Sequence, residues 1–220
     1  MSLQKLSFLF FCFIALSNCA QENDQKSIRK PFALSDYLSE NEDLNKHVDS
    51  VMGTLDEKAI IAQLIMPAAG KYGKPKTTID GLIKDQLIGG ILMLNGTKQE
   101  FTSLIAEFNQ DNIDYGNLPF LYSADAEPSL VNRKITGSTP VKKANEIDSL
   151  HGVTHVAETI SKDLNDIGIN YNFAPVVDMS KNSTVGYRGF GKDPINIIPW
   201  SDEFIKVTQE NFPTTKQLGS

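Results

Sequence analysis

The sequence predicts an α/β fold in which parallel strands alternate with helices. Three observations predict it: short apolar runs recur along the chain, a segment of helical periodicity follows each run, and polar residues stand where the runs end. The runs are continuously apolar, as expected when helices cover the outer face of a parallel sheet. The chain has 220 residues, 40% hydrophobic and 22% charged, which suffices for one sizeable core.

The body begins with a short helix and a first strand. Thr54-Leu55-Asp56-Glu57 has the spacing of a capping box, in which the threonine hydroxyl and the glutamate carboxylate satisfy free amides at a helix start. We therefore expect a helix to begin there. It leads into an apolar stretch ending at Pro67, which we interpret as the first strand.

Three more apolar runs and four periodic segments complete four strand–helix units. The expected strands are residues 89–95, 118–124 and 169–177, and the expected helices are residues 79–87, 101–108, 147–164 and 200–207. Four units alone fit either a doubly wound sheet or a barrel, because both gather functional residues at the carboxyl ends of strands. Asn95, Asp125 and Asp178 stand at such ends. Residues 67–75 lack the glycine spacing of a dinucleotide-binding turn.

The first residues predict export. Lys5 precedes an apolar run, residues 6–16, which has signal-peptide length. The run ends in LSNC, which resembles a bacterial lipobox with Cys19 as the lipid-attachment residue. An ordinary signal peptide with an incidental Cys19 is the alternative. We expect residues 1–18 to be a signal peptide, residues 19–43 a polar, lipid-anchored flexible tether, and residues 44–220 the folded body.

The composition limits the possible binding partners and the cellular compartment of the protein. The formal net charge of −6 and the absence of a long basic run argue against nucleic acid as a partner. Both cysteines lie within the first 19 residues, so the body has no thiol for a disulfide. The expected location is the membrane, reached through the N-terminal lipid, on the periplasmic side or at the outer-membrane surface, because Glu22 and Asp24 resemble a surface-export signal of some lipoproteins.

Three ordered motifs resemble glycoside hydrolases of family 3. They are SADAEPSLVNR at 123–133, IGINYNFAPVVD at 167–178 and GYRGFGKDP at 186–194. The resemblance implies a (β/α)₈ barrel, of which this chain would hold about four units and a fifth-strand stub, because such barrels need roughly 250 residues. The branch it most resembles contains β-N-acetylglucosaminidases. Pro128 and Ser129 replace the family's paired glycines, as in a Bacteroidetes-type lipoprotein subgroup.

The resemblance implies four sugar-binding residues. Asp125 corresponds to an aspartate that accepts hydrogen bonds from sugar hydroxyls, and Arg133, eight positions later, to an arginine that helps to hold the site. Arg188 corresponds to a sugar-contacting arginine, which we expect Asp178 to brace. Lys216 aligns with a sugar-contacting lysine, although glutamine follows it where the family has histidine. Carboxylates and guanidinium groups suit this task because they grip neighbouring hydroxyls with charge-assisted hydrogen bonds.

The resemblance implies that the residues that break the glycosidic bond come from other strands. A retaining glycosidase needs a carboxylate nucleophile and an acid/base partner; in the family these come from the seventh strand and from a loop after the fifth. We therefore assign no catalytic residue and expect a truncated hydrolase whose missing C-terminal barrel half is a candidate partner. A noncatalytic saccharide-binding lipoprotein, or a β-glucosidase-type member of the family, stays open.

The sequence predicts neither a cofactor nor a metal. His151 and His155 lie four residues apart within the expected long helix, which is also a metal-ligand spacing. No carboxylate-rich HExxH context surrounds them, so solvated histidines on the outer face are the favoured interpretation.

Overall fold

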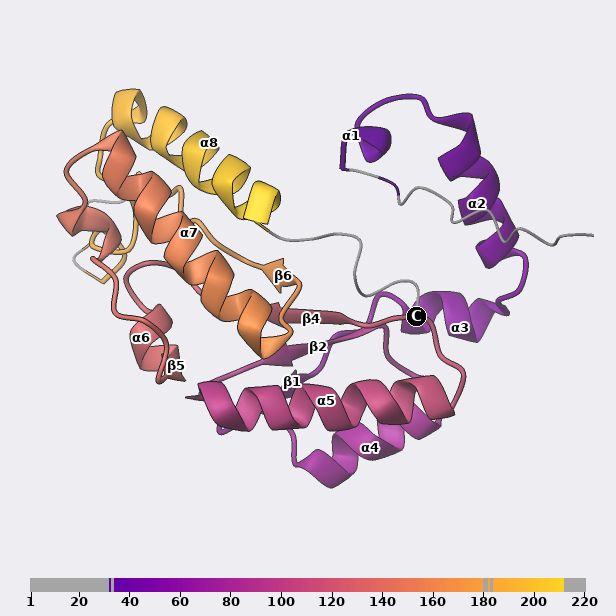
Figure 1. The fold of residues 1–220 in the computed structure, drawn as a ribbon. Helices are drawn as coiled ribbons and strands as arrows, with labels where there is room; N and C mark the ends of the chain where they lie inside the picture. Colours follow the sequence, from indigo (N-terminus) through magenta and orange to yellow (C-terminus); the bar gives the residue numbers. More distant parts are fainter. Residues whose placement is uncertain (1–31, 33, 180–181, 183, 212–220) are drawn as a thin grey trace, which may run out of the picture. The chain divides into compact units, whose positions relative to one another are not determined.

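The structure is a computed structural model that describes residues 32, 34–179, 182 and 184–211, all within one compact unit, Pro31–Ser220. Figure 1 shows helices and short strands in alternation. The strands are β1 (Ala68–Ala69), β2 (Gly90–Met93), β3 (Gly96–Thr97), β4 (Leu121–Ala124), β5 (Ile135–Thr136) and β6 (Tyr171–Asn172). The helices are α1 (Leu34–Tyr37), α2 (Glu42–Met52), α3 (Glu57–Ala62), α4 (Lys76–Lys84), α5 (Lys98–Asp114), α6 (Val131–Lys134), α7 (Leu150–Ile167) and α8 (Pro194–Asn211), with a 3₁₀ turn at Ala144–Glu146.

The main sheet is parallel, and its strand order follows the chain. β1 pairs with β2, β2 with β4, and β4 with β6. One row of partners crosses it, from Ala68 through Leu92 and Ser123 to Tyr171. A doubly wound sheet reverses its strand order at the switch point. The order of the described strands does not reverse, as in the wall of a barrel.

Helices cover one face of this wall. The helices that follow successive strands of the sheet contact one another: α4 with α5, α5 with α7, and α7 with α8. The strand side chains beneath them are Ile91, Met93, Tyr122 and Ala124, and all four are buried in one core. Leu121, on the alternate face of β4, keeps 48% of its surface exposed. The predicted α/β class with parallel, helix-covered strands is confirmed.

The helix start expected at Thr54 lies two residues later. Asp56 is the N-cap of α3, because its carboxylate accepts a hydrogen bond from the Ala59 amide at 2.8 Å. The Thr54 hydroxyl instead donates to the Val51 carbonyl at 2.7 Å, where α2 ends. Both side chains could cap, and the one that reaches the third residue of the helix does so.

The first strand also begins later than predicted. Leu64 lies in a turn and is exposed, and β1 starts after Pro67. The Leu92 amide donates to the Pro67 carbonyl at 2.9 Å, so pairing with β2 starts at the proline. Proline accepts a hydrogen bond but has no amide to donate, which places it at the first residue of a strand.

A small second sheet was not predicted. β3 pairs in parallel with β5, with Gly96 opposite Ile135 and Thr97 opposite Thr136. This pairing joins the end of β2 to the segment after β4.

Helix α1 and the start of α2 fall within the segment that was predicted to be a tether, residues 19–43. Within the described ranges, no helix combines the length and the apolar composition needed to cross a bilayer.

Candidate functional site

The turn after β4 carries two carboxylates and is held by the next strand. Asp125 and Glu127 follow β4 at its carboxyl end. Between them, the Ala126 amide donates to Oδ1 of Asn172 at 3.0 Å, and Nδ2 of Asn172 donates to the Ala126 carbonyl at 3.3 Å. Because Asn172 belongs to β6, two neighbouring strands fix the turn that presents the carboxylates.

Glu127 is buried and forms a bidentate ion pair with Arg188. Nε of Arg188 donates to Oε1 at 2.7 Å, and Nη2 donates to Oε2 at 2.6 Å. The Glu127 side chain is 0% exposed, whereas that of Arg188 keeps 30%. The hydrogen bonds to Glu127 raise the pKa of Arg188, which stays charged. The guanidinium has five N–H groups, so its exposed edge can still donate to a ligand.

Lys134, rather than Arg133, contacts Asp125. Nζ of Lys134 forms an ion pair with Oδ2 of Asp125, and the two side chains keep 15% and 33% of their surfaces exposed. Both basic residues belong to α6. Consecutive residues of a helix point about 100° apart, so only one of them can face Asp125. Arg133 is exposed and lines a neighbouring cavity.

The residues predicted from the sequence thus separate. Asp125 and Arg188 lie at the same end of the sheet, and the charge of Asp125 contributes to the raised pKa of Arg188. Arg133 turns towards the cavity. Lys216 and Cys19 lie outside the described residues, so their roles in sugar contact and lipid attachment stay predictions.

The brace for Arg188 is Glu127 and not Asp178. Asp178 is exposed and forms no ion pair within the part of the chain that the structure describes, whereas Glu127 meets the guanidinium with both oxygens. The sequence offers a signal for this role, because Glu127 stands two residues after Asp125 in a segment that is otherwise apolar or small. A carboxylate at such a buried position requires a cation.

Ser129, which stands where the family has a glycine, is a positioning residue that was not predicted. Its hydroxyl donates to the Tyr187 carbonyl at 2.8 Å and accepts from the Ala144 amide at 2.9 Å. Tyr187 precedes Arg188, so this bond ties the arginine loop to the turn after β4. A hydroxyl in place of a motif glycine was the signal that could have identified it.

A cavity of about 810 Å³ adjoins this ion-pair cluster. It opens at the carboxyl ends of β1 and β2, because its lining includes residues that directly follow these strands. Lys134 lines the cavity and also contacts Asp125, so the two features share a side chain. The lining residues are Lys71, Tyr72, Asn95, Gly96, Thr97, Glu100, Arg133, Lys134 and Thr136.

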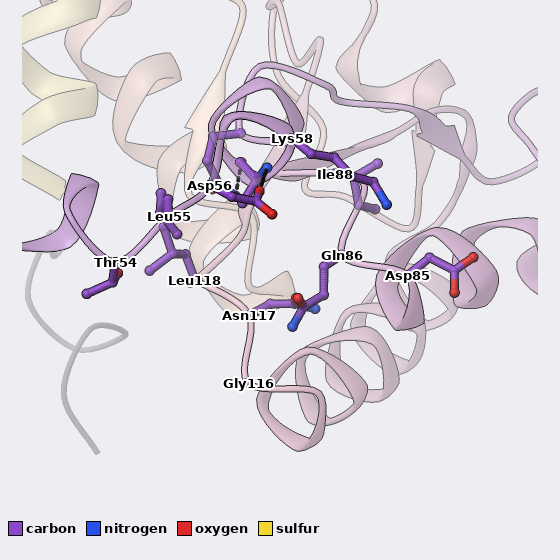
Figure 2. A pocket seen from close by; sticks show the side chains of 12 residues that line it. Thr54, Leu55, Asp56, Lys58, Asp85, Gln86, Ile88, Gly116, Asn117 and Leu118 are labelled. Atoms are coloured by element: carbon purple, nitrogen blue, oxygen red, sulfur yellow. Dashed lines mark hydrogen bonds between the residues drawn. The ribbon is translucent and has the colours of Figure 1, made fainter.

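A second cavity, of about 450 Å³, lies at the amino ends of the strands (Figure 2). Its lining comes from the loops that precede β2 and β4 and from the start of α3. Its polar side chains mostly bond the backbone: Nε2 of Gln86 donates to the Tyr115 carbonyl at 2.8 Å, and Nδ2 of Asn117 donates to the Ile83 carbonyl at 3.0 Å. This cavity is a structural feature of the loops.

Glu203 lies on α8, and His151 and His155 lie on α7. Oε1 of Glu203, on α8, accepts a hydrogen bond from the Thr154 hydroxyl on α7 at 2.6 Å, which keeps it between helices. Within the described ranges, His, Cys, Asp and Glu side chains form no group of three that could hold a metal ion. The site therefore consists of two ion pairs and an adjoining cavity.

Comparison with known proteins shows relatives that are much longer. The beta-hexosaminidase LpqI of Mycobacterium tuberculosis is 27% identical in an alignment of 124 residues that covers 53% of this chain and 31% of that protein. The structure of a glycoside hydrolase family 3 beta-N-acetylglucosaminidase from a Paenibacillus strain matches with a TM-score of 0.64 and 26% identity, over 71% of this chain and 31% of that one. The structure of LpqI itself matches with a TM-score of 0.60 over 73% of this chain and 47% of that one; at 22% identity this likeness shows the fold alone.

The chain spans less than half the length of these relatives. Residues 54–217 match the N-terminal domain of glycosyl hydrolase family 3, and they include every motif that carried the resemblance. The parallel wall of the barrel, with its charged cluster at the strand ends, is the structure of this matched region. The chain belongs to glycosyl hydrolase family 3, in its N-terminal domain.

Proposed function

We propose that this domain recognises the terminal sugar of β-linked N-acetylglucosamine-type saccharides in a retaining glycoside hydrolase. Membership of the family supports hydrolysis, and the names of the hexosaminidase-like relatives support the sugar class. The observation that carries the proposal is the cluster after β4, where Asp125 and Arg188 expose polar edges while a buried carboxylate and a lysine hold them.

In the proposed site, the carboxylate of Asp125 accepts hydrogen bonds from sugar hydroxyls. Its ion pair with Lys134 engages one carboxylate oxygen, Oδ2, and leaves Oδ1 available. Arg188 donates from its exposed edge, because Glu127 occupies the other edge. An acceptor and a donor of fixed orientation can grip two neighbouring hydroxyls, and hydrogen bonds to charged groups are stronger than neutral ones.

The described carboxylates are not assigned to bond cleavage. Both oxygens of Glu127 are bonded to Arg188, and Asp125 is paired with Lys134, so we assign these carboxylates to holding the site and the sugar rather than to nucleophilic attack or proton transfer. Binding without stabilisation of the transition state gives no rate. We therefore expect the 220-residue chain to bind saccharide without hydrolysing an aryl β-N-acetylglucosaminide.

Calorimetric titration of the 220-residue chain with N-acetylglucosamine tests the proposal. Asp125→Asn should weaken binding by about tenfold or more, because hydrogen bonds to charged groups contribute about 1.5–3 kcal/mol. Asp148→Asn, which removes an exposed carboxylate paired with Lys142, is the matched control and should leave binding unchanged. Equal affinity of the Asp125→Asn variant and the parent chain would refute the site. Turnover that depends on a carboxylate of this chain would show that the catalytic groups are misassigned.

Export and lipid anchorage form a separate proposal that rests on the sequence around Cys19. Two acyl chains give stable membrane attachment, since each buried methylene contributes about 0.8 kcal/mol. When the gene is expressed in a Gram-negative host, the parent chain should partition into the membrane fraction and a Cys19→Ser variant should not. Equal membrane recovery of the two would contradict the anchor.

A further inference from the structure

Asp163 is a buried carboxylate of α7 that the proposed sugar contacts do not use. Its side chain keeps 7% of its surface exposed. Both of its oxygens accept hydrogen bonds: Oδ1 from Nζ of Lys98 at 2.7 Å and from the Thr139 hydroxyl at 3.2 Å, and Oδ2 from the Thr139 amide. A buried carboxylate costs free energy unless it is paired and hydrogen-bonded, so these partners are held in place.

The partners of Asp163 come from the segments that follow the small second sheet. Lys98 directly follows β3, and Thr139 lies three residues after β5, so the carboxylate holds together the two segments that leave the paired strands. Asp166, three residues along α7, also contacts Lys98, at 3.1 Å. Among the residues that the structure describes, the two aspartates share a lysine, but Asp163 alone also holds the loop after β5.

Asn132 carries this restraint from the loop to α6. Its Nδ2 donates to the Thr139 carbonyl at 2.8 Å and to the Ser138 hydroxyl at 2.9 Å, and its Oδ1 accepts from the Val141 amide at 3.0 Å. The side-chain amide thus uses both its donor and its acceptor on one loop, which fixes its orientation. Thr139 bonds Asp163 through its amide and Asn132 through its carbonyl, so a single residue links α7 to α6.

Helix α6 depends on such contacts because it cannot fix its own rotation. It has four residues, and no side chain caps its start. A helix of about one turn is unstable by itself in water. Arg133 and Lys134 directly follow Asn132, and consecutive residues of a helix point about 100° apart. The orientation of Asn132 therefore decides which of the two cations faces Asp125, and in the structure it is Lys134.

We propose that Asp163 is a positioning residue for the saccharide site. It acts through Thr139 and Asn132, which hold α6 in one rotation. That rotation pairs Lys134 with Asp125 and gives the carboxylate a fixed orientation, so less ordering free energy is lost when a sugar binds. The inference rests on the proposed function, because Asp125 is the proposed acceptor for sugar hydroxyls.

Saccharide affinity and lysine reactivity of the 220-residue chain test the proposal together. Asp163→Leu keeps the approximate shape of the side chain but removes both acceptors, while Lys98 retains Asp166. In calorimetric titration, affinity for N-acetylglucosamine should fall by about three- to fivefold, because Asp125 loses a partly exposed ion pair that orients it. Acetylation of Lys134 by acetic anhydride, measured by mass spectrometry, should rise severalfold, since its side chain is only 15% exposed in the parent chain.

Asp166→Leu is the matched control. It removes the other carboxylate from Lys98 on the same helix and leaves the bonds to the loop intact, so it should change neither affinity nor the acetylation of Lys134. Lys46 of α2, with 72% of its side chain exposed, is the internal reference for the reagent. A general loss of structure would also raise the acetylation of Lys76 in its ion pair on α4, whereas release of α6 would not.

Asn132→Ala interrupts the same route at an exposed residue, so it tests the proposal even if Asp163→Leu does not fold. It should reproduce both effects. The double variant should lose no more affinity than either single variant, because changes that act through one network are not additive.

Unchanged affinity, or unchanged acetylation of Lys134, in both single variants would overturn the inference, and sugar binding by the parent chain would leave the proposed function intact. Failure of the parent chain to bind sugar would instead refute the proposed function. Acetylation of Lys134 would then still show whether Asp163 fixes the rotation of α6.

Discussion

The two ends of the sheet use polar side chains in different ways. At the amino ends, Gln86 and Asn117 donate to backbone carbonyls, and Asp56 accepts from a backbone amide. At the carboxyl ends, Asp125 and Glu127 pair with cations that come from other segments of the chain. The first arrangement satisfies groups that folding would otherwise leave unbonded. The second one gathers charge at one place.

Within one barrel wall, some polar side chains therefore stabilise the fold, and others are available to bind a ligand. A side chain that caps a helix or closes a loop uses part of its hydrogen-bonding capacity on the backbone, which also fixes its position. An ion pair at the surface of a cavity keeps an exposed edge, as Arg188 does with 30% of its side chain accessible. In barrels, functional sites lie at the carboxyl ends of the strands. In this domain the charged side chains that keep an exposed edge lie at that same end.

The largest expected effect is at the carboxyl end, from Arg188→Met. This change leaves the fully buried Glu127 without a cation, which should lower the free energy of unfolding by about 3–5 kcal/mol. Adding Glu127→Gln should recover much of the loss, because the uncompensated charge is then removed. Lys142→Met, in an exposed ion pair, should change stability by less than about 1 kcal/mol. Urea unfolding measures all three, and an Arg188→Met loss no larger than that of Lys142→Met would show that the buried pair is not structural.

Two glycines, one at each end of the sheet, test the comparison between the two ends. Gly70, after β1, has a φ of 105°, and an added Cβ would lie 2.6 Å from the Leu94 carbonyl oxygen. Gly116, at the amino-end cavity, has a φ of 69° with open space around it (Figure 2). Gly116→Ala should cost about 1–2 kcal/mol from backbone strain alone, and Gly70→Ala should cost more, because strain and a clash with backbone act together. Equal losses in urea unfolding would contradict the tight packing of loops at the carboxyl end.

The third prediction concerns the cap at the amino end. Asp56→Ala should lower the free energy of unfolding by about 1 kcal/mol, because α3 loses the acceptor for the Ala59 amide. It should leave saccharide affinity unchanged. Thr54→Ala is the control, and it should cost less, since the Thr54 hydroxyl bonds a carbonyl at the end of α2. Thermal unfolding that ranks these two variants in the opposite order would restore Thr54 as the cap.

The smallest effect is expected between the two ends, at Tyr122 of β4. Burial, and secondarily the charge of Asp111, raises the pKa of its hydroxyl above the ordinary value of 10.0. The folded chain therefore keeps the proton where the unfolded chain loses it, so stability that is present below pH 10 declines as the pH rises above 10. Tyr122→Phe should change stability little at pH 7, because the hydroxyl has no hydrogen-bond partner among the described residues. Above pH 10 the variant should lose less stability than the parent chain in urea titrations, and parallel losses would contradict the burial of this hydroxyl.

Much of the fold could be predicted from local patterns. Apolar periodicity located α4, α5, α7 and α8 and the strands β2 and β4, because side chains that pack on one core must recur at helical or strand spacing. Strand lengths were less predictable. The run at residues 169–177 yields only β6. The amides of Asn170 and Phe173 on either side of it donate to carbonyls of β4, and the side chains of Asn170 and Asn172 add hydrogen bonds to the backbone around β4.

The candidate site was predictable in its location but not in its pairing. Asp125 and Arg188 stand in motifs after apolar runs, which was enough to place both at one end of the sheet. Arg133 was expected to help hold the site, whereas Lys134 contacts Asp125; Asp178 was expected to brace Arg188, whereas Glu127 does so. Sequence spacing gives the distance along the chain but not the rotation of a four-residue helix.

The sequence by itself determined the alternation of strands and helices, the family and the end of the sheet at which charge collects. Those features depend on the order of apolar and polar residues, which can be read directly from the sequence. Only the tertiary structure decided that strand order follows the chain and that Lys134 faces Asp125. Both depend on contacts between segments far apart in sequence. Such contacts are selected by packing and by the cost of leaving a buried charge unpaired, and neither is a property of a local sequence pattern.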